Sequence, residues 1–274
     1  MNIIKSFIES LDFTRGKYIN QDIFRDVISL TVYIIQVFLI GNKNYIEDLD
    51  TVLKKYNESE KVMLQNLAYK LINIYKNQKE PVDILGEVFN QLNMSNVKTG
   101  QFFTPTHISK AIAKITGIDE DAIKKNGYTR IHEPSCGAGG IILAYAKEIQ
   151  AIGYDTYRNM LVQCWDIDRN CALMTYIQLS MYDIPAEVIC GDILAYKSSE
   201  ILYTPAYYLF QQLKKENKLK VPLCDLCSKE ITGKIKYSQF KPNLKLCEQC
   251  YRTEQRVILV ENIVNVNFKR VVNE

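Results

Sequence analysis

A glycine-rich turn is the first group of residues whose type and spacing point to chemistry. It reads Glu133-Pro134-Ser135-Cys136-Gly137-Ala138-Gly139-Gly140 and joins an expected strand to an expected helix. Glycine lets the backbone approach a ligand closely, and amides at the start of a helix offer N–H donors to polar or negative groups. The turn is not the dinucleotide fingerprint G-x-G-x-x-G, because no glycine occupies its last position. A glycine turn alone is weak support for a ligand site, so the neighbouring residues decide.

Acidic residues follow the ends of three expected strands, and these are Glu133, Asp166 and Asp192. In an open parallel sheet, ligands bind beyond the carboxyl ends of the strands. A carboxylate after the second strand can accept hydrogen bonds from both ribose hydroxyls. A carboxylate after the third strand can accept a hydrogen bond from an adenine amino group. Glu133 can face an ammonium group. The set fits an adenosine with a cationic amino-acid tail, and the alternative is that the acids are only solvated strand ends.

Four cysteines near the end of the sequence have the spacing of a zinc site. They are paired as Cys224-x2-Cys227 and Cys247-x2-Cys250, and two such pairs complete a tetrahedral zinc centre with no open position. We predict a structural Zn²⁺ ion, with redox thiols as the alternative. Lysines and aromatic residues alternate through this segment, which suits contact with a nucleic acid backbone. Contact with another protein is the competing interpretation.

The composition is that of a globular protein with a hydrophobic core. The chain has 274 residues, of which 47% are hydrophobic and 24% are charged, and this excludes disordered and collagen-like classes. The net charge of +3 is too small to identify a partner. The basic excess lies in residues 211–274, which hold 13 Lys/Arg and 7 Asp/Glu.

The elements that must position the turn and the acids alternate between strand and helix. We predict a helix over Pro105–Thr116 with Thr104 as its cap, and a strand–helix–strand–helix–strand series. The members of that series are Tyr128–His132, Gly140–Gln150, Met160–Trp165, Arg169–Met181 and Ala186–Cys190. This order indicates an α/β fold with a Rossmann-like parallel sheet. The predicted units are a helical domain (1–95), the α/β core (96–210), the zinc module (211–255) and a terminal strand or tail (256–274).

The amino-terminal quarter reads as helical and has no chemical signature. Apolar residues recur at helical spacing over Glu60–Tyr75, and Asn57 with Glu60 fits a capping box. The most apolar run, Val27–Ile40, is too short to span a bilayer, so we expect a buried helix and no membrane contact. No secretory signal is evident at the start. Eight cysteines without an export signal favour a reducing, cytoplasmic location.

Several of these segments together resemble the adenine-N6 DNA methyltransferases. The segments are Gly100-Gln101-Phe102-Phe103-Thr104-Pro105, Glu133 to Gly140 and Gly191-Asp192-Ile193-Leu194, preceded by Asp83-Ile84-Leu85-Gly86-Glu87-Val88-Phe89. They look like successive motifs of the family, and the most similar members are the modification subunits of type I restriction systems. The resemblance covers residues 80–195 well and residues 1–80 loosely.

The resemblance implies a methyltransferase core that uses S-adenosylmethionine (SAM). Thr104 and the turn with Gly137 and Gly139 would hold the methionine end, and Phe103 would wall the pocket. The Glu133-Pro134 pair would lie by the ammonium group. Asp166 would bind the ribose and Asp192 the adenine of the cofactor.

The family's catalytic motif, Asn or Asp followed by Pro-Pro and Tyr or Phe, is absent, because the sequence has no Pro-Pro pair. The nearest segment is Thr204-Pro205-Ala206-Tyr207, where Thr204 would accept from the adenine amine and Tyr207 would stack on a flipped base. The alternative is that this segment has no catalytic role and only forms a turn before another helix.

By resemblance, the reaction is methyl transfer to adenine N6 in DNA, with a specificity subunit, a restriction subunit or a second copy as further partner. A non-catalytic relative that binds DNA or protein is the second hypothesis. A zinc-containing interaction protein whose sheet binds no nucleotide is the third.

Overall fold

The computed structural model describes residues 3–14, 16–76, 78, 80–94, 104–216 and 219. It also describes two short paired strands, β5 (Lys236–Tyr237) and β6 (Lys245–Leu246). The predicted boundary near residue 95 and most of the predicted zinc module and tail fall outside these residues. The predicted division into four units therefore stays a prediction.

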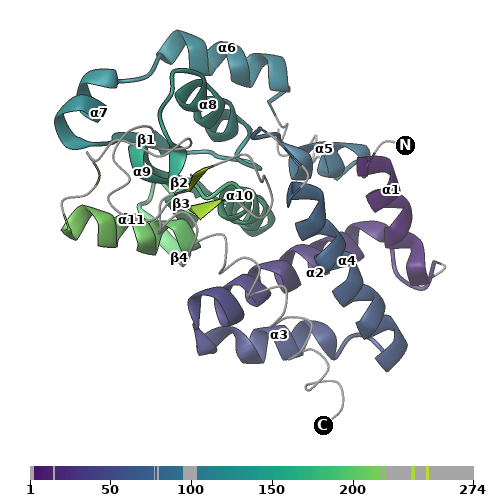
Figure 1. Ribbon diagram of the computed structural model, residues 1–274. Coiled ribbons are helices and arrows are strands. Elements are labelled where there is room, and N and C mark those ends of the chain that lie inside the picture. Colours follow the sequence, from purple (N-terminus) through teal and green to yellow (C-terminus); the bar gives the residue numbers. More distant parts are fainter. Residues whose placement is uncertain are drawn as a thin grey trace.

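A four-stranded sheet lies at the centre of the α/β part (Figure 1). Its strands are β1 (Thr129–Glu133), β2 (Met160–Asp166), β3 (Ala186–Asp192) and β4 (Lys197–Tyr203), in that spatial order. The first three run parallel, which confirms the predicted parallel α/β sheet, and β4 runs antiparallel to β3. The sequence analysis missed β4, because it begins with exposed polar residues and lies at an edge.

Helices cover the sheet on the side of the main core (Figure 1). The crossover helices α8 (Gly140–Ala151) and α10 (Arg169–Met181) join the parallel strands, and α6 (Thr106–Thr116) packs along α8. Three further helices complete this part, namely α7 (Glu120–Asn126), α9 (Thr156–Asn159) and α11 (Pro205–Lys215). The residues from Cys171 to Ser180 are all buried, so α10 lies inside the protein rather than on its surface.

The amino-terminal part is helical, as predicted, and its helices are α1 (Ile3–Ser10), α2 (Asn20–Ile34), α3 (Ile46–Leu53), α4 (Glu58–Lys76) and α5 (Ile84–Gln91). Short 3-10 turns occupy Leu11–Thr14 and Lys43–Tyr45. The predicted capping box begins α4. The amide of Asn57 donates to Glu60 Oε2 and the amide of Glu60 donates to Asn57 Oδ1, both at 2.9 Å. The two residues therefore satisfy each other's exposed N–H groups.

The helix that contains the predicted run Val27–Ile40 is longer than that run, because it begins at Asn20, and α2 continues as a π-helical turn over Ile35–Ile40. The whole helix has 21 residues and a mean hydropathy of 1.9, so by length and composition it is long enough to cross a membrane. However, Phe24, Ile28 and Leu30 are completely buried in the fold. The carboxylate of Asp26 on the same helix accepts from Tyr56 and Lys55. The prediction of a buried helix is confirmed.

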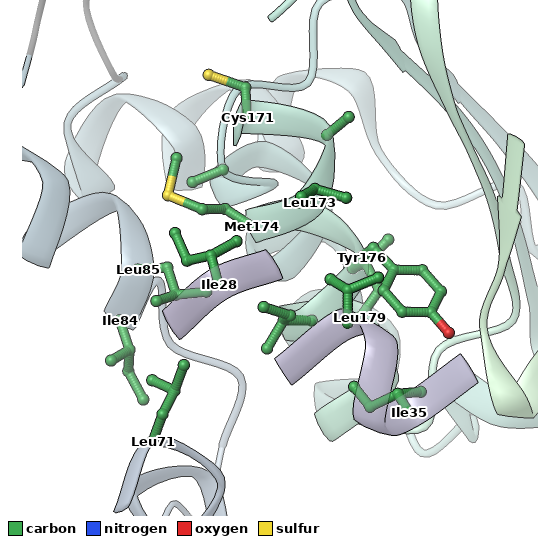
Figure 2. Packing of buried hydrophobic residues seen from close by; sticks show 14 of the residues in the cluster. Ile28, Ile35, Leu71, Ile84, Leu85, Cys171, Leu173, Met174, Tyr176 and Leu179 are labelled. Atoms are coloured by element: carbon green, nitrogen blue, oxygen red, sulfur yellow. The ribbon is translucent and has the colours of Figure 1, made fainter. Parts of the chain in front are cut away.

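The helical part and the sheet share one hydrophobic core, which extends from Phe7 to Leu202. Figure 2 shows side chains of α2, α4, α5 and α10 meeting in its middle. Tyr176 and Leu179 of α10 face Ile35 of α2 there, and Met174 lies near Ile28. Each fully buried side chain of this kind contributes about 1.5–3 kcal/mol. The amino-terminal helices are therefore packed against the α/β layers and not tethered beside them.

A buried amide on α10 joins the two parts through hydrogen bonds. Gln178 is fully buried, and its Oε1 accepts from the Tyr75 hydroxyl and from the amides of Ile84 and Leu85. Its Nε2 donates to Asp83 Oδ1 at 2.8 Å and to the Ala138 carbonyl at 2.6 Å. One side chain thus links α4, the start of α5 and the glycine turn after β1.

Replacing Gln178 by leucine is expected to lower the free energy of unfolding by about 3 kcal/mol or more. Several buried donors and acceptors lose their partner, and each such loss costs about 1–3 kcal/mol. Urea denaturation measures the change. Gln212→Leu, at an exposed position on α11, is the matched control and should stay within about 0.5 kcal/mol. A Gln178→Leu protein as stable as this control would contradict the role given to the amide.

Candidate functional site

The three predicted acids lie at one edge of the sheet. Glu133, Asp166 and Asp192 are the last residues of β1, β2 and β3. The strands are adjacent and parallel, so their carboxyl ends meet at the same edge. This is the edge at which open α/β sheets bind ligands.

Asp166 ties the glycine turn to the end of β2. Its Oδ2 accepts from the amide of Gly137 at 2.8 Å, and its Oδ1 accepts from the amide of Asp168 at 2.9 Å. The side chain is mostly buried, and burial raises the pKa of the Asp166 carboxyl above its ordinary value. A carboxylate has more lone pairs than these two bonds use, so it can also accept from a ligand hydroxyl.

The glycine turn adopts the conformation for which glycine is needed. Gly137 and Gly139 have φ values of 55° and 91°, in the left-handed region that other residues resist. The amide of Gly139 donates to the Cys136 carbonyl at 2.7 Å, and the amide of Cys136 donates to the Trp165 carbonyl at 2.8 Å. α8 begins directly afterwards without a side-chain cap, so its first amides can donate to a ligand.

Two side chains of α10 donate hydrogen bonds to carbonyl groups of the glycine turn. The Thr175 hydroxyl donates to the Gly137 carbonyl at 2.8 Å, and Gln178 donates to the Ala138 carbonyl. A Cβ at Gly139 would lie only 3.2 Å from Thr175 Oγ1, so the helix fits closely under a glycine backbone. Sequence analysis missed both residues. The available signal was two polar residues, three apart, in the stretch 171–179, which is otherwise apolar and buried.

The other two acids shape the loops that follow their strands. Glu133 Oε1 accepts from the Ser135 amide at 3.2 Å, and Asp192 Oδ1 accepts from the amides of Leu194 and Ala195. Glu133 is half-buried. Burial is the main cause that raises the pKa of the Glu133 carboxyl, and the negative charge of Asp166 raises this pKa further. Pro134, next to Glu133, is exposed.

Exposed apolar side chains accompany the acids at this edge. Ile167 is 76% exposed directly after Asp166, and Leu194 is 96% exposed two residues after Asp192. Tyr196 is 78% exposed, and its ring centre lies 5.6 Å from that of Trp165. Apolar surfaces beside hydrogen-bonding acids suit a flat aromatic ligand such as a purine. Ile167 and Tyr196 were not singled out from the sequence, and Leu194 was noted only as part of the segment Gly191-Asp192-Ile193-Leu194.

The structure places Thr104 immediately before α6 and corrects its predicted capping role. The helix begins at Thr106, Pro105 occupies the cap position, and no side chain caps the helix. Pro105 is therefore not the first helical residue, and Thr104 lies one position further out than predicted. Phe103 lies outside the described residues, so its predicted place in the pocket stays a prediction.

The structure does not bring Thr204, Pro205 and Tyr207 to the site. Because β4 runs antiparallel, it ends at the opposite edge of the sheet. Thr204 Oγ1 is fully buried, accepts from the Ala186 amide at 2.9 Å and donates to the Ile184 carbonyl at 2.8 Å. Pro205 is the first residue of α11, and Tyr207 packs on Tyr203 with ring centres 4.6 Å apart. The catalytic role predicted for these three residues is therefore corrected. They form the turn before α11, as the alternative interpretation of the segment predicted.

The predicted zinc ligands, Cys224, Cys227, Cys247 and Cys250, lie outside the described residues. Among the residues that are described, no group of three His, Cys, Asp or Glu side chains could hold a metal ion. The other four cysteines are buried free thiols, and they are Cys136, Cys164, Cys171 and Cys190.

Comparison with known proteins finds a family model that matches part of the chain. Residues 80–212 match the family model described as N-6 DNA Methylase. A similar solved structure comes from Listeria monocytogenes and is described as a class I S-adenosylmethionine-dependent methyltransferase. It is 15% identical with a TM-score of 0.33, and the likeness covers 60% of this chain and 52% of that chain. The chain thus spans about half the length of that protein, and no curated protein sequence matches it.

The family match spans the lead-in helix α5, the glycine turn and the three strand-end acids, and it ends within α11. It ends at residue 212, before Cys224, the first of the predicted zinc ligands. Residues 80–212 of the chain are therefore similar to the N-6 DNA methylase family.

Proposed function

We propose that the chain binds SAM at the carboxyl edge of its sheet and serves methyl transfer to adenine N6 in DNA. The observation that carries this proposal is the set of three strand-end acids around a glycine turn in the left-handed conformation. The family match over residues 80–212 supports methylation of DNA. A role in a type I restriction-modification system, with a specificity or restriction subunit as partner, belongs to the same proposal.

The residues at the edge fit the chemistry of this cofactor. Asp166 has lone pairs free for the ribose hydroxyls, and Asp192 accepts from the adenine amino group. Ile167 and Leu194 offer apolar surface to the purine. Glu133 faces the positively charged end, and the glycine turn with Thr104 holds the methionine end. Phe103 and Pro134 complete this set as proposed pocket residues.

The cofactor supplies an activated methyl group on a sulfonium ion, and the chain positions it. The acids and the turn would hold the nucleoside, and the sulfonium group would supply the methyl group for transfer. Holding the two reactants in one orientation is the main contribution expected from such an enzyme. An adenine amine also needs hydrogen-bond acceptors, because its lone pair is delocalised into the ring. Thr204 cannot provide one, since it lies at the other edge.

A second candidate function is cofactor binding without turnover, in a DNA-binding or protein-binding regulatory component. The sequence favours it through the missing Pro-Pro motif. It is also favoured by the burial of Thr204, which leaves the described edge without an assigned acceptor for the amine. The alternative is that another chain, or residues outside those described, supply that acceptor.

Calorimetry with SAM, followed by transfer of a labelled methyl group to adenine-containing duplexes, separates the two candidates. Binding with incorporation supports methyl transfer. Binding without incorporation at high protein concentration supports the regulatory role. A chain that binds no SAM would overturn both.

The carboxyl-terminal module is proposed to hold a structural Zn²⁺ ion on Cys224, Cys227, Cys247 and Cys250. Four thiolates fill a tetrahedral centre, so this zinc has a folding role and no catalytic one. The basic residues of the module make it suited to DNA backbone contact. The free thiols of the core agree with a reducing, cytoplasmic compartment.

Asp166→Ala is expected to weaken SAM binding by about 100-fold, because a carboxylate that accepts from the ribose is lost. Glu133→Ala should weaken it by about tenfold. Isothermal titration calorimetry measures both changes. Asp121→Ala is the matched control, since the Asp121 side chain is 99% exposed on α7, away from the site. Equal affinities for the Asp166→Ala protein and the control would contradict the assignment.

SAM affinity is expected to fall as the pH is lowered from about 7.5 to about 5. Protonation of Glu133 removes the charge that faces the cationic tail. Because burial raises the pKa of Glu133 in the folded protein, this loss begins at a higher pH than for an exposed glutamate. The Glu133→Gln variant, titrated in the same buffers, should show a flatter profile. Profiles of the same slope would rule out Glu133 as the titrating partner.

The purified chain is expected to carry about one zinc ion, as a closed four-thiolate centre requires. Cys224→Ser should lose the metal, measured by elemental analysis, without weakening SAM binding. Cys171→Ser, at a buried thiol of α10, is the control and should keep the metal. Full zinc content in the Cys224→Ser protein would exclude the proposed ligand set.

A further inference from the structure

Two positive charges from different parts of the chain meet at Tyr128, the residue immediately before β1. Arg130 comes from β1, and Lys214 comes from the last turn of α11. Arg130 Nη2 donates to the Tyr128 hydroxyl at 3.3 Å, and the guanidinium carbon lies 5.8 Å from the centre of the Tyr128 ring. Lys214 Nζ lies 5.4 Å from the same ring centre. The site proposed above uses none of these three residues.

The hydrophobic core holds the Tyr128 ring in place. Tyr128 is buried and packs edge-on against Phe210, with ring centres 5.0 Å apart. Leu213 and Leu219 complete this small cluster. A ring that is fixed by its packing gives its hydroxyl one position, so the group around Tyr128 is arranged before any ligand binds.

Neither cation has an acidic partner. Arg130 and Lys214 are exposed, and neither forms an ion pair with a residue in the part of the chain that the structure describes. Lys124 on α7, by contrast, pairs with Glu120 at 3.5 Å. Two unpaired positive charges around one phenol repel each other, and a bound anion offsets that repulsion.

The pKa of Tyr128 reflects the same excess of positive charge. Burial raises the pKa of the phenol, but hydrogen bonding to Arg130 and Lys214 and the charges of both cations lower it, and the lowering is larger. The two cations therefore stabilise negative charge at the position of the Tyr128 hydroxyl, as they would on a bound anion.

The group also offers the hydrogen-bond donors that an oxyanion needs. Arg130 has further guanidinium N–H groups, and the Lys214 ammonium has three. The Tyr128 hydroxyl accepts from Arg130, and its own O–H donates to no residue that the structure describes. Arginine and lysine are the side chains that proteins use most to bind phosphate oxygens, so the donor set suits a phosphate group.

We propose that Tyr128, Arg130 and Lys214 bind a phosphate group of the DNA backbone. The choice of DNA as the source of that phosphate rests on the proposed function, in which DNA is the substrate. Arg130 is the second residue of β1 and Glu133 is the last, so this phosphate site is separate from the acids at the carboxyl edge. A contact to backbone phosphate adds affinity and orients the duplex, and it carries no base recognition.

The test measures how tightly the full chain binds a labelled DNA duplex, by fluorescence anisotropy over a series of salt concentrations and without cofactor. Arg130→Gln and Lys214→Gln should each weaken binding by about tenfold. Each should also reduce the slope of log affinity against log salt by about one, because one phosphate contact is lost. Tyr128→Phe keeps the buried ring and should weaken binding by about threefold with an unchanged salt dependence, because the hydroxyl is uncharged.

Lys54→Gln is the matched control, because it removes the same charge from an exposed lysine. Lys54 follows α3 in the helical part, away from β1 (Figure 1), and is already paired with Asp50 at 2.6 Å. The control should change DNA affinity by less than about twofold and leave the salt dependence unchanged. Thermal unfolding checks that all four variants fold as the wild type does.

A second titration identifies the source of the phosphate. Inorganic phosphate, followed by calorimetry, should bind the wild-type chain more weakly than the duplex does. Inorganic phosphate that binds at least as tightly as the duplex would overturn the inference, because the site would then serve a small phosphate compound.

Arg130→Gln and Lys214→Gln proteins that bind DNA like the Lys54→Gln control would also overturn the inference and leave the proposed function standing. A wild-type chain that binds DNA through these residues but binds no SAM would instead overturn the proposed function and leave the phosphate site standing. A wild-type chain that binds no DNA would overturn both.

Discussion

The site depends on one buried amide, that of Gln178. A glutamine side chain inside a hydrophobic core is tolerated only when its donors and acceptor are satisfied. Here the partners come from α4, from the start of α5 and from the glycine turn, so the amide is satisfied only when all three are in place. The turn therefore keeps its left-handed residues because the helical part of the chain is folded against α10. The conformation of the glycine turn and amino-terminal packing are linked through this residue.

Strand direction decides which residues can take part in chemistry. Each of the three parallel strands ends with an acidic residue, and the three residues lie at the same edge of the sheet. The antiparallel β4 delivers the next segment, with Thr204, to the other edge. A change of direction in a single strand thus separates residues that are close in the sequence. It assigns Thr204 to the support of β3, whose first amide it satisfies, and removes it from any contact with a base.

The sequence predicts those parts of the fold that depend on local pattern. Alternation of strand and helix predicts the parallel sheet, and the pair of Asn57 and Glu60 predicts the start of α4 because the capping box involves only neighbouring residues. The acids were found because they follow apolar strands. β4 was missed because an edge strand with a polar start has no clear alternation. The parts played by Gln178 and Thr175 depend on contacts between distant segments, which no single segment encodes.

The burial of α10 on every side has a consequence for folding. An isolated helix with apolar residues around its whole circumference has no polar face to expose to water, so it is not stable as an independent unit. The sheet covers one side of α10 and the helices α2, α4 and α5 cover the other. Neither layer is complete without the other, and the two are expected to form and melt in a single cooperative transition. The arrangement of acids at the carboxyl edge of the sheet then lasts only as long as the contact between these layers.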